Sequence, residues 1–538
     1  MFDGEQEPLL SESDSSVRPA DASHDDNNVP NASHSRAIEE DVLPETATYG
    51  RNLGWGGAYI IVISRVIGSG IFATPGSITK SVGSIGLSLL LWIAGAVLAA
   101  CGLSISLEYG CMLPRSGGDK VYLEFTYRHP RFLASTIVAV HAVVLGFTAS
   151  NCIVFGRYTI FALGINSTEF AQKALAVGLL TLITIIHGYS VKAGIAIQNA
   201  LGWVKMFLIL IMVASGLYVV IFRPRSSEGP TPGAAAFRWD ALWQDSNWSF
   251  GIVSTALFKV FYSYAGLSNV NNVLNEVKDP VRTLKSVSHV ALFTSCFLYL
   301  LVNLAYFVVI PLDEIKDSGE LVAALYFERV FGPALGRTIL PLAIATSAAG
   351  NVMVVTFALA RVNQEIARQG FLPLADILSS SRPFNTPLGG LIVHYIPSLL
   401  VITLPPLGDV YAFILDVEGY PGQFFGLAVS VGIIWLRVKR PDLQRPYKAW
   451  LPAVWLRIAV CLVLIASPFV RPEDGKGDVS FFYATYAIVG IGIIAFAVLY
   501  WYIWFVVWPR WCGLKIEELE EVLEDGTSIT RLVRVKAE

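Results

Sequence analysis

Long apolar stretches separated by short polar loops occupy most of the chain from Gly54 onwards. About twelve of them are long enough to cross a bilayer as helices. They span residues 54–79, 85–113, 132–163, 171–189, 194–222, 248–275, 285–310, 334–361, 388–404, 410–435, 451–469 and 481–508. The pattern predicts an all-α polytopic membrane protein.

Two of these stretches have poor helix sequences at their centres. The first contains Gly68-Ser69-Gly70, and the sixth turns small and polar at Ala265-Gly266. A break leaves backbone groups unpaired, which the membrane tolerates only where the break is buried in protein or lines a watery cavity. Small residues also serve close helix packing. Broken helices at matching positions of two halves indicate a transporter binding site, and these two match if ten spans form two five-helix halves.

Composition and the terminal segments support this picture. Of 538 residues, 54% are hydrophobic and 15% are charged, whereas soluble domains carry about 25% charged residues. Residues 1–52 are polar and are expected to be a disordered acidic cytoplasmic tail. The transmembrane transporter domain is expected to cover residues 53–511. Residues 512–538 are expected to be a cytoplasmic C-terminal tail with a helix near 516–523.

Loop charges predict the orientation of the chain. Loops with Lys120 and Arg440 are rich in cations, and they alternate with loops that hold acids such as Asp313 and Glu320. Cationic loops favour the cytoplasm, so both termini are predicted to be cytoplasmic. Asn166 lies in an Asn-Ser-Thr sequence of a predicted exterior loop. It is either a glycosylation acceptor or too close to the membrane to be modified.

Other kinds of chemistry have little support in the sequence. There is no CxxC motif, no HExxH motif and no His–Cys cluster at metal-ligand spacing, so neither a metal nor a cofactor is expected. Basic residues form no face for nucleic acid. No nucleophile and base stand in a catalytic arrangement, so an enzyme is not expected. No cysteine lies in a predicted exterior loop, and no structural disulfide is expected.

Several short motifs carry a resemblance to a known family. Ile67-Gly-Ser-Gly-Ile-Phe72, Pro114-Arg-Ser-Gly-Gly118 and Glu276-Val-Lys-Asp-Pro280 resemble the amino acid–polyamine–organocation (APC) superfamily of transporters. The stretches 303–307 and 381–387 are similar to the L-type branch, and within it to fungal high-affinity methionine permeases. The resemblance covers residues 53–511.

The resemblance implies a LeuT-like fold: two inverted five-helix repeats with broken helices 1 and 6, plus two extra helices. It also implies that backbone groups at the breaks bind the carboxylate and ammonium of an amino acid. By motif match, the substrate-binding residues are Ile67, Gly68, Ser69 and Gly70 from the first break and Tyr262, Ala265, Gly266 and Leu267 from the sixth helix. Animal relatives have a large aromatic at the position of Leu267, so this pocket has another shape. Methionine suits an aliphatic and aromatic lining, and leucine or cysteine also suits it.

Three ionisable residues within predicted spans are candidates for ion coupling or gating, because such residues are rare in membranes. Lys205 stands where the family places a lysine in members without a sodium site. It is either a structural cation or a proton-coupling group. Arg65, just before the first break, is either functional in gating or part of a structural ion pair. Glu418 is either a proton site or a group that faces an exterior vestibule.

These features predict a plasma-membrane importer of a neutral amino acid, with methionine as the leading substrate, driven by proton symport with alternating access. The alternatives are an uncoupled exchanger, a broader L-type permease, and a nutrient sensor that binds without transport. The predicted partners are the amino acid, the proton and membrane lipid. Residues 164–170 lack the cysteine that links animal relatives to a heavy chain, so no covalent heavy chain is expected. The cytoplasmic tails could recruit a ubiquitin-ligase adaptor.

Overall fold

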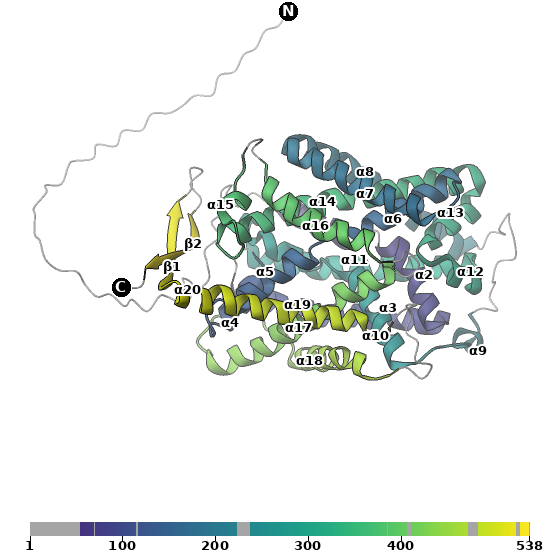
Figure 1. The fold of residues 1–538 in the computed structure, drawn as a ribbon. Helices are drawn as coiled ribbons and strands as arrows, with labels where there is room; N and C mark the ends of the chain where they lie inside the picture. The colour runs from purple at the N-terminus through teal and green to yellow at the C-terminus, as the bar shows by residue number, and fades with distance from the viewer. Residues whose placement is uncertain are drawn as a thin grey trace, which may run out of the picture. The chain divides into compact units, whose positions relative to one another are not determined.

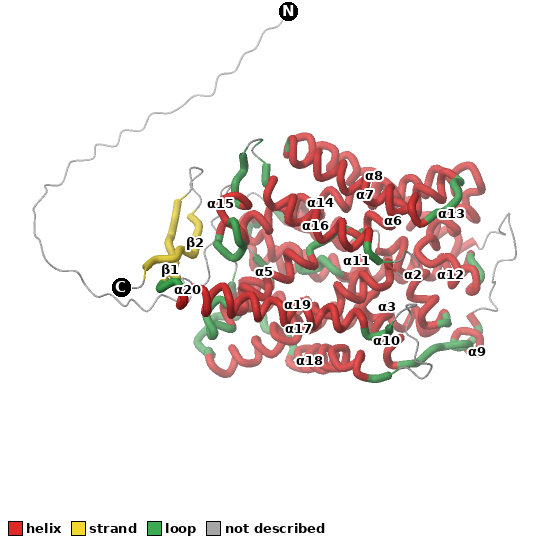
Figure 2. The backbone as a smooth tube through the Cα atoms, viewed as in Figure 1, coloured by secondary structure: helices red, strands yellow, loops and turns green. Residues whose placement is uncertain are grey.

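The computed structural model describes residues 54–68, 70–113, 117–222, 237–382, 384, 386–405, 410–471, 482–522 and 528–536. Helices make up most of this part of the chain, and two strands near the C-terminus form its one sheet (Figures 1 and 2). The predicted N-terminal tail lies outside the described residues. The prediction of an all-α polytopic membrane protein is confirmed for the body of the chain.

The first half of the chain begins with two helices in place of the first predicted span. The helices of this half are α1 (Trp55–Val66), α2 (Gly70–Val82), α3 (Ile85–Met112), α4 (Asp119–Thr126), α5 (Leu133–Leu145), α6 (Ala149–Leu163), α7 (Glu169–Tyr189) and α8 (Val191–Phe222). Helix ends follow local chemistry. The Ser84 hydroxyl caps α3 by accepting the Leu87 N–H at 3.3 Å, and the Thr168 hydroxyl caps α7 in the same way.

The second half contains another divided span. Its first elements are α9 (Trp239–Leu242), α10 (Phe250–Tyr264), the 3₁₀ helix η2 (Asn269–Glu276), α11 (Pro280–Val309), α12 (Leu312–Ser318), η3 (Gly319–Leu321), α13 (Val322–Gly332) and the π-helical η4 (Pro333–Ile339). They are followed by α14 (Leu340–Arg368), α15 (Ala375–Leu378), α16 (Leu388–Thr403), α17 (Val410–Lys439), α18 (Leu451–Ala466), η5 (Ser467–Phe469), α19 (Thr485–Trp501), η6 (Tyr502–Val507) and α20 (Trp508–Trp511).

Eight helical stretches among the described residues are long and apolar enough to cross a membrane. The other predicted spans coincide with α1 and α2, with α8, with α10 and η2, and with α16. The count of about twelve spans and the inverted repeat remain predictions. The segment between the seventh and eighth predicted spans, expected as a loop, forms α12, η3 and α13 instead.

The two ends of the helices are distinct in Figure 1. We call the end with α9, α12, η3 and α13 the Glu320 end, after the buried acid in η3. We call the end with α4 and α15 the Glu108 end, after the buried acid in the last turns of α3. Helix α10 contributes Val260 to one large apolar core and Phe258 to another. Tyr264 and Leu267, which flank the break after α10, belong to the first of these cores.

The third predicted span, expected to be continuous, is divided. Helix α5 ends at Leu145, and α6 begins at Ala149. His394 of α16 donates from Nδ1 to the Gly146 carbonyl at 2.8 Å, and the Thr148 N–H donates to the Ser398 hydroxyl at 3.3 Å. Side chains of α16 thus satisfy backbone groups that a continuous helix would have satisfied itself.

The C-terminal tail is a β-hairpin, so the predicted helix near 516–523 is wrong. Strands β1 (Leu514–Val522) and β2 (Ser528–Lys536) pair antiparallel, with Leu514 opposite Lys536. The sequence between the strands contains Asp525-Gly526, a pair that favours hairpin turns. The hairpin contacts the end of α14, because the Leu532 N–H donates to the Gln369 carbonyl at 3.2 Å.

Candidate functional site

The first helix is broken where the glycines predicted it. Helix α1 ends at Val66, and the chain resumes as α2 at Gly70. The Ile67 N–H still donates to the Ile63 carbonyl at 2.9 Å, whereas the Gly68 N–H donates to the Val66 carbonyl at 2.9 Å. The amides in the first turn of α2 have no acceptor within that helix. Ser69 lies outside the described residues.

The second predicted break is also confirmed. Helix α10 ends at Tyr264, after which Ala265 is extended with ψ 137° and Gly266 has φ +105°. Glycine adopts this positive φ without the steric cost that a side chain brings. The chain then turns and continues as η2 from Asn269.

The two breaks lie against each other. A Cβ on Gly266 would stand 2.6 Å from Cγ of Arg65, and a Cβ on Gly70 would stand 3.4 Å from Cα of Ser263. The hydroxyls of Thr74 and Ser263 are hydrogen-bonded at 2.8 Å. The absence of a side chain at both glycines therefore allows the unwound segments to meet.

One phenol joins the two breaks and was missed in the sequence. The Tyr299 hydroxyl of α11 lies 2.8 Å from the Val66 carbonyl and 2.7 Å from the Ser263 carbonyl. Both carbonyls are in the last turn of a helix and lack a partner within it. The hydroxyl has one proton, which the two carbonyls share, and the Val66 carbonyl also accepts the Gly68 N–H. A tyrosine in an apolar run reads as a core residue, and nothing local identifies this role.

A small cavity of about 80 Å³ opens where the breaks meet, and we call it the central cavity. Its lining residues are Arg65, Val66, Gly68, Gly70, Phe147, Ser150, Asn151, Tyr262, Ser263, Ala265, Asn351, Val355 and Glu418. The structure thus brings most of the predicted site residues together. Ile67 is buried against Ile71 and Tyr299 instead, and Leu267 lines a neighbouring cavity.

Polar side chains from three helices form one wall of the central cavity. The Tyr262 hydroxyl of α10 lies 3.1 Å from the Ser150 hydroxyl of α6. Asn151 donates from Nδ2 to the Tyr262 hydroxyl at 3.4 Å, and Asn351 of α14 donates to Asn151 Oδ1 at 3.1 Å. Of these residues only Tyr262 was predicted from the sequence. An isolated asparagine within an apolar helix was the available signal for the other two helices.

The candidate coupling residues have different positions. Arg65 and Glu418 both line the central cavity, and their opposite charges attract each other. Within the described part of the chain neither forms a close ion pair. Lys205 belongs to α8, which packs against α14 and α11, but its side chain lies outside the described residues. The predicted tether through Lys205 therefore stays a prediction.

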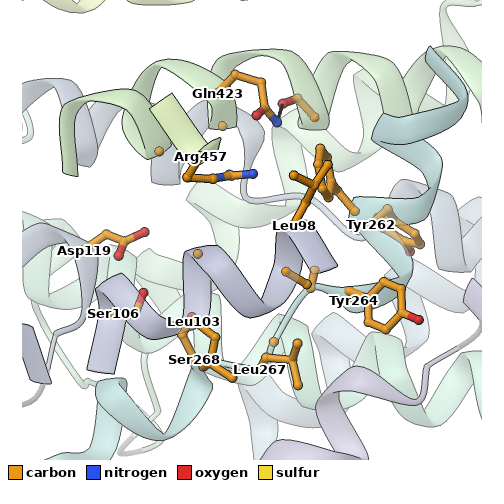
Figure 3. A pocket seen from close by; sticks show the side chains of 18 of the residues that line it. Leu98, Leu103, Ser106, Asp119, Tyr262, Tyr264, Leu267, Ser268, Gln423 and Arg457 are labelled. Carbon is orange, nitrogen blue, oxygen red and sulfur yellow. Dashed lines mark hydrogen bonds between the residues drawn. The ribbon is translucent and has the colours of Figure 1, made fainter. Parts of the chain in front are cut away.

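A larger cavity of about 350 Å³ lies between α3, α4, α10, α17 and α18, and we call it the side cavity (Figure 3). It shares Tyr262, Ala265 and Glu418 with the central cavity. It reaches Asp119 of α4 at the Glu108 end. The central cavity thus has a neighbouring space on one side of α10.

Toward the Glu320 end the site is closed by packing. The Tyr158 hydroxyl of α6 lies 3.0 Å from the Phe72 carbonyl and 2.7 Å from the Glu320 carbonyl, and the two carbonyls share its one proton. Arg157 forms an ion pair with the buried Glu320 carboxylate. A Cβ on Gly76 of α2 would overlap the backbone carbonyl of Gly319. Helix α2 therefore contacts η3 at the backbone, without room for solvent between them.

Discontinuous helices whose broken ends meet at a polar cavity are typical of secondary transporters. Residues 53–507 match the family model described as amino acid permease, and the chain belongs to this family. It is therefore a multi-pass membrane transporter of amino acids and not an enzyme. The predicted membership in the APC superfamily is confirmed.

Individual relatives narrow the comparison. The chain is 31% identical over 504 residues to the low-affinity methionine permease of Saccharomyces cerevisiae, covering 92% of this chain and 90% of the relative. It is 32% identical over 482 residues to the high-affinity methionine permease of the same yeast, covering 88% and 83%. It is also 29% identical over 429 residues to the human b(0,+)-type amino acid transporter 1, covering 78% and 83%.

Proposed function

We propose that this protein imports methionine across the plasma membrane and binds it in the central cavity. The observation that carries the proposal is the contact between the two breaks, at Gly70 with Ser263 and at Gly266 with Arg65. This contact brings backbone groups that have no partner within their own helices to one small cavity. Two relatives with substantial coverage are methionine permeases, which favours methionine among neutral amino acids.

The backbone at the breaks suits the two charged ends of an amino acid. Amides in the first turn of α2, beginning at Gly70, would bind the carboxylate, because a helix N-terminus attracts anions. The carbonyls of Val66 and Ser263 would bind the ammonium, in exchange for the shared Tyr299 hydroxyl. Gly68 and Ser69 would belong to the carboxylate side, with Ile67 as their support.

The substrate side chain would extend past Ala265 toward the side cavity. That space is lined largely by apolar residues, among them Leu267 and Phe258. An unbranched thioether adapts to such an irregular apolar surface. Tyr262 lines both cavities and would separate the polar end of the substrate from its apolar end.

The distribution of loop charges orients the molecule. Lys120, Lys285 and Arg437 lie at the Glu108 end, and Asp313 and Glu314 lie at the Glu320 end. The positive-inside rule then makes the Glu108 end cytoplasmic, with both tails on that side. In this orientation the site is sealed toward the exterior. Transport would require the opposite state as well, which is alternating access.

We further propose that uptake is coupled to protons, with Glu418 as the proton carrier and Arg65 as its partner. The two groups face the same cavity as the substrate, so substrate and proton could control one another. Lys205 would hold α8 near the first break as a fixed cation. A sodium-dependent mechanism would bring a sodium ion near Lys205 and Arg65, and the positive charges of these two side chains would repel it.

Uptake of labelled methionine into liposomes that contain the purified chain tests this function. Acid outside should drive accumulation, an uncoupler should abolish it, and sodium replacement should leave it unchanged. Efflux that depends on exterior amino acid would instead show an exchanger, and binding without flux would show a sensor. Competition by unlabelled leucine or cysteine at equal strength would show a broader permease. Absence of both binding and flux would contradict the proposal.

The coupling residues have their own test in the same liposomes. Glu418→Gln should retain exchange of interior for exterior methionine and lose accumulation driven by the proton gradient. Accumulation at the wild-type level would remove Glu418 from the coupling mechanism. The single purified chain is sufficient in this experiment if, as proposed, no covalent heavy chain is needed.

The remaining proposals concern the C-terminal tail and the predicted exterior loop that contains Asn166. Lys515 and Lys536 are exposed on the hairpin and are the proposed sites for ubiquitin attached through a ligase adaptor. Replacing both with arginine should slow removal from the plasma membrane, and normal turnover would contradict this role. Asn166 is exposed, and a mass shift after deglycosylation would show whether it carries a glycan.

A further inference from the structure

The side cavity contains charged groups that the proposed transport mechanism does not use. Arg457 of α18 and Asp119 of α4 both line it. In Figure 3 these two residues and Ser106 lie on one side of the space, and Tyr262, Tyr264 and Leu267 lie on the other. At about 350 Å³ the cavity is within the range of small-molecule sites. It is several times larger than the central cavity.

The guanidinium of Arg457 is held in place by the shape of two neighbouring helices. A Cβ on Gly426 of α17 would stand 2.9 Å from its Nη, and a Cβ on Gly102 of α3 would stand 3.8 Å from its Nε. The guanidinium carbon lies 5.3 Å from the centre of the Phe261 ring. Gly102, Gly426 and the Phe261 ring thus leave a gap through which the Arg457 side chain reaches the cavity.

Arg457 has no carboxylate partner in ion-pair contact within the described part of the chain. A charged side chain in a membrane helix is costly and usually faces a partner or a watery cavity. Asp119 is the carboxylate whose charge acts on it, but the two side chains do not form a close ion pair. Asp119 is exposed, so its carboxylate is accessible to a ligand in the cavity.

Arg457, Asp119 and a mostly apolar lining match the groups of a zwitterionic amino acid. Glu418, the other carboxylate in the lining, lies on the wall shared with the central cavity. A guanidinium binds a carboxylate through charge-assisted hydrogen bonds. The Asp119 carboxylate attracts an ammonium. Leu98, Leu103 and Leu267 provide apolar surface for a side chain. A purely anionic ligand would leave Asp119 repelled, and a purely cationic one would leave Arg457 repelled.

We propose that the side cavity is a second binding site for the transported amino acid, with Arg457 as the carboxylate ligand and Asp119 as the ammonium ligand. This inference rests on the proposed function. The two sites share the walls formed by Tyr262, Ala265 and Glu418, so a substrate leaving the central cavity passes directly into the side cavity. The second site thus lies between the central cavity and the Glu108 end, and the substrate would bind there after it leaves the breaks.

Equilibrium binding of labelled methionine to the purified full chain in detergent tests the proposal. The wild type should bind two molecules per chain. Arg457→Leu should weaken one of them at least about tenfold, as expected when a charge-assisted hydrogen bond is lost. Gly70→Val should remove the other and leave the Arg457-dependent one. The matched control is Leu456→Gln, which changes the adjacent, half-exposed residue of α18 and should retain both.

A second variant keeps the test decisive if Arg457→Leu fails to fold. Gly426→Val displaces the guanidinium while retaining its charge and should also remove the second site. Arg457→Lys should retain it in part. One molecule per wild-type chain, or two per Arg457→Leu chain, would overturn the proposal while uptake in liposomes left the proposed function intact. A phospholipid retained by the wild type and lost from Arg457→Leu in native mass spectrometry would also overturn it.

Discussion

The two ends of the helix bundle close the central cavity in different ways. At the Glu320 end, α2 meets η3 backbone to backbone, and Tyr158 and Arg157 bind to Glu320. Toward the Glu108 end the neighbouring space is a cavity bounded by side chains of α3, α17 and α18. One end is sealed by direct contact, and the other contains room for a ligand.

The two ends also differ in what holds their walls. The fully buried Glu108 accepts hydrogen bonds from Nε of Arg437 at 3.0 Å and from the Ala449 N–H at 2.8 Å, with Arg445 close by. These bonds join α3, α17 and the start of α18, which are walls of the side cavity. The seal at the Glu320 end instead joins α6 and α2 to the short helix η3. We therefore expect the Glu320 seal to open and close while the walls at the Glu108 end stay together.

The largest effect on methionine uptake is expected from disrupting the contact between the two breaks. Gly266→Ala places a Cβ 2.6 Å from Cγ of Arg65 at a φ of +105°, and both the overlap and the strain cost free energy. Methionine uptake should fall about a hundredfold, the factor that roughly 2.7 kcal/mol represents. Initial uptake rates per folded protein provide the measurement.

Gly178→Ala is the matched control for that experiment. Gly178 is exposed on α7, lines neither cavity, and a Cβ on it would have no atom within 4 Å. Its uptake should stay within about twofold of wild type, the range of a surface change of less than about 0.5 kcal/mol. If Gly266→Ala transports as well as Gly178→Ala, close contact between the breaks is not required.

The next effect is expected at the sealed end. Glu320→Gln removes the carboxylate charge that pairs with Arg157, and breaking a buried pair costs about 3–5 kcal/mol. The seal should loosen, with a lower thermal midpoint and slower methionine uptake. Glu314→Gln is the control, because its pair with Arg329 is partly exposed at the same end and is expected to contribute less than about 1 kcal/mol. Equal effects of the two variants would show that the Glu320 pair is no gate.

Local chemistry explains which parts of this arrangement could be predicted. Both breaks were predicted because glycine and small polar residues interrupt apolar runs at Gly68 and Gly266. The closure by Glu320 was not predicted, because its partner Arg157 lies 163 positions away in the sequence. The break between α5 and α6 was missed for the same reason. Its backbone groups are satisfied by His394 and Ser398 of a distant helix.

The site residues also divide into those that a local motif identifies and those that depend on partners far away in the sequence. Gly70, Tyr262 and Ala265 were found by motif, and they line the central cavity. Asn351 and Tyr299 act through partners on other helices, and the sequence contains no local sign of those partners. A C-terminal helix was predicted near residues 516–523, where the chain has an acidic run. The pairing of that run with the basic β2 decides its structure instead.

A smaller effect is expected from the phenol that joins the breaks. Tyr299→Phe leaves the Val66 and Ser263 carbonyls without their shared donor, which costs about 1–3 kcal/mol. The substrate-free protein should melt at a lower temperature, and saturating methionine should stabilise the variant more than it stabilises wild type, because the ammonium replaces the missing donor. Thermal unfolding with and without methionine measures both quantities.

Tyr306→Phe tests whether this result is specific to the breaks. Tyr306 is equally buried on α11, but among the described residues its hydroxyl has only a long hydrogen bond of 3.4 Å, to the Ile71 carbonyl. Methionine should stabilise this variant by the same amount as wild type. An identical ligand response in Tyr299→Phe would show that the ammonium does not bind at the two carbonyls.

The smallest effect is expected at the hairpin, which lies beyond the side cavity at the Glu108 end. Deleting residues 514–538 removes the hydrogen bond from Leu532 to Gln369 and the stacking of Arg534 over Trp504 at 4.2 Å. Glu108 with Arg437, Arg445 and Ala449, which we call the Glu108 cluster, already joins α3, α17 and α18, so uptake should stay within about twofold. The loss of one hydrogen bond and one cation–π contact should lower the free energy of unfolding by about 1–2 kcal/mol. Leu532→Ala, which keeps the strand pairing, should fall between wild type and the deletion in thermal midpoint. Loss of uptake in the deletion at normal folding yield would mean that the hairpin, and not the Glu108 cluster alone, keeps this end of the path in place.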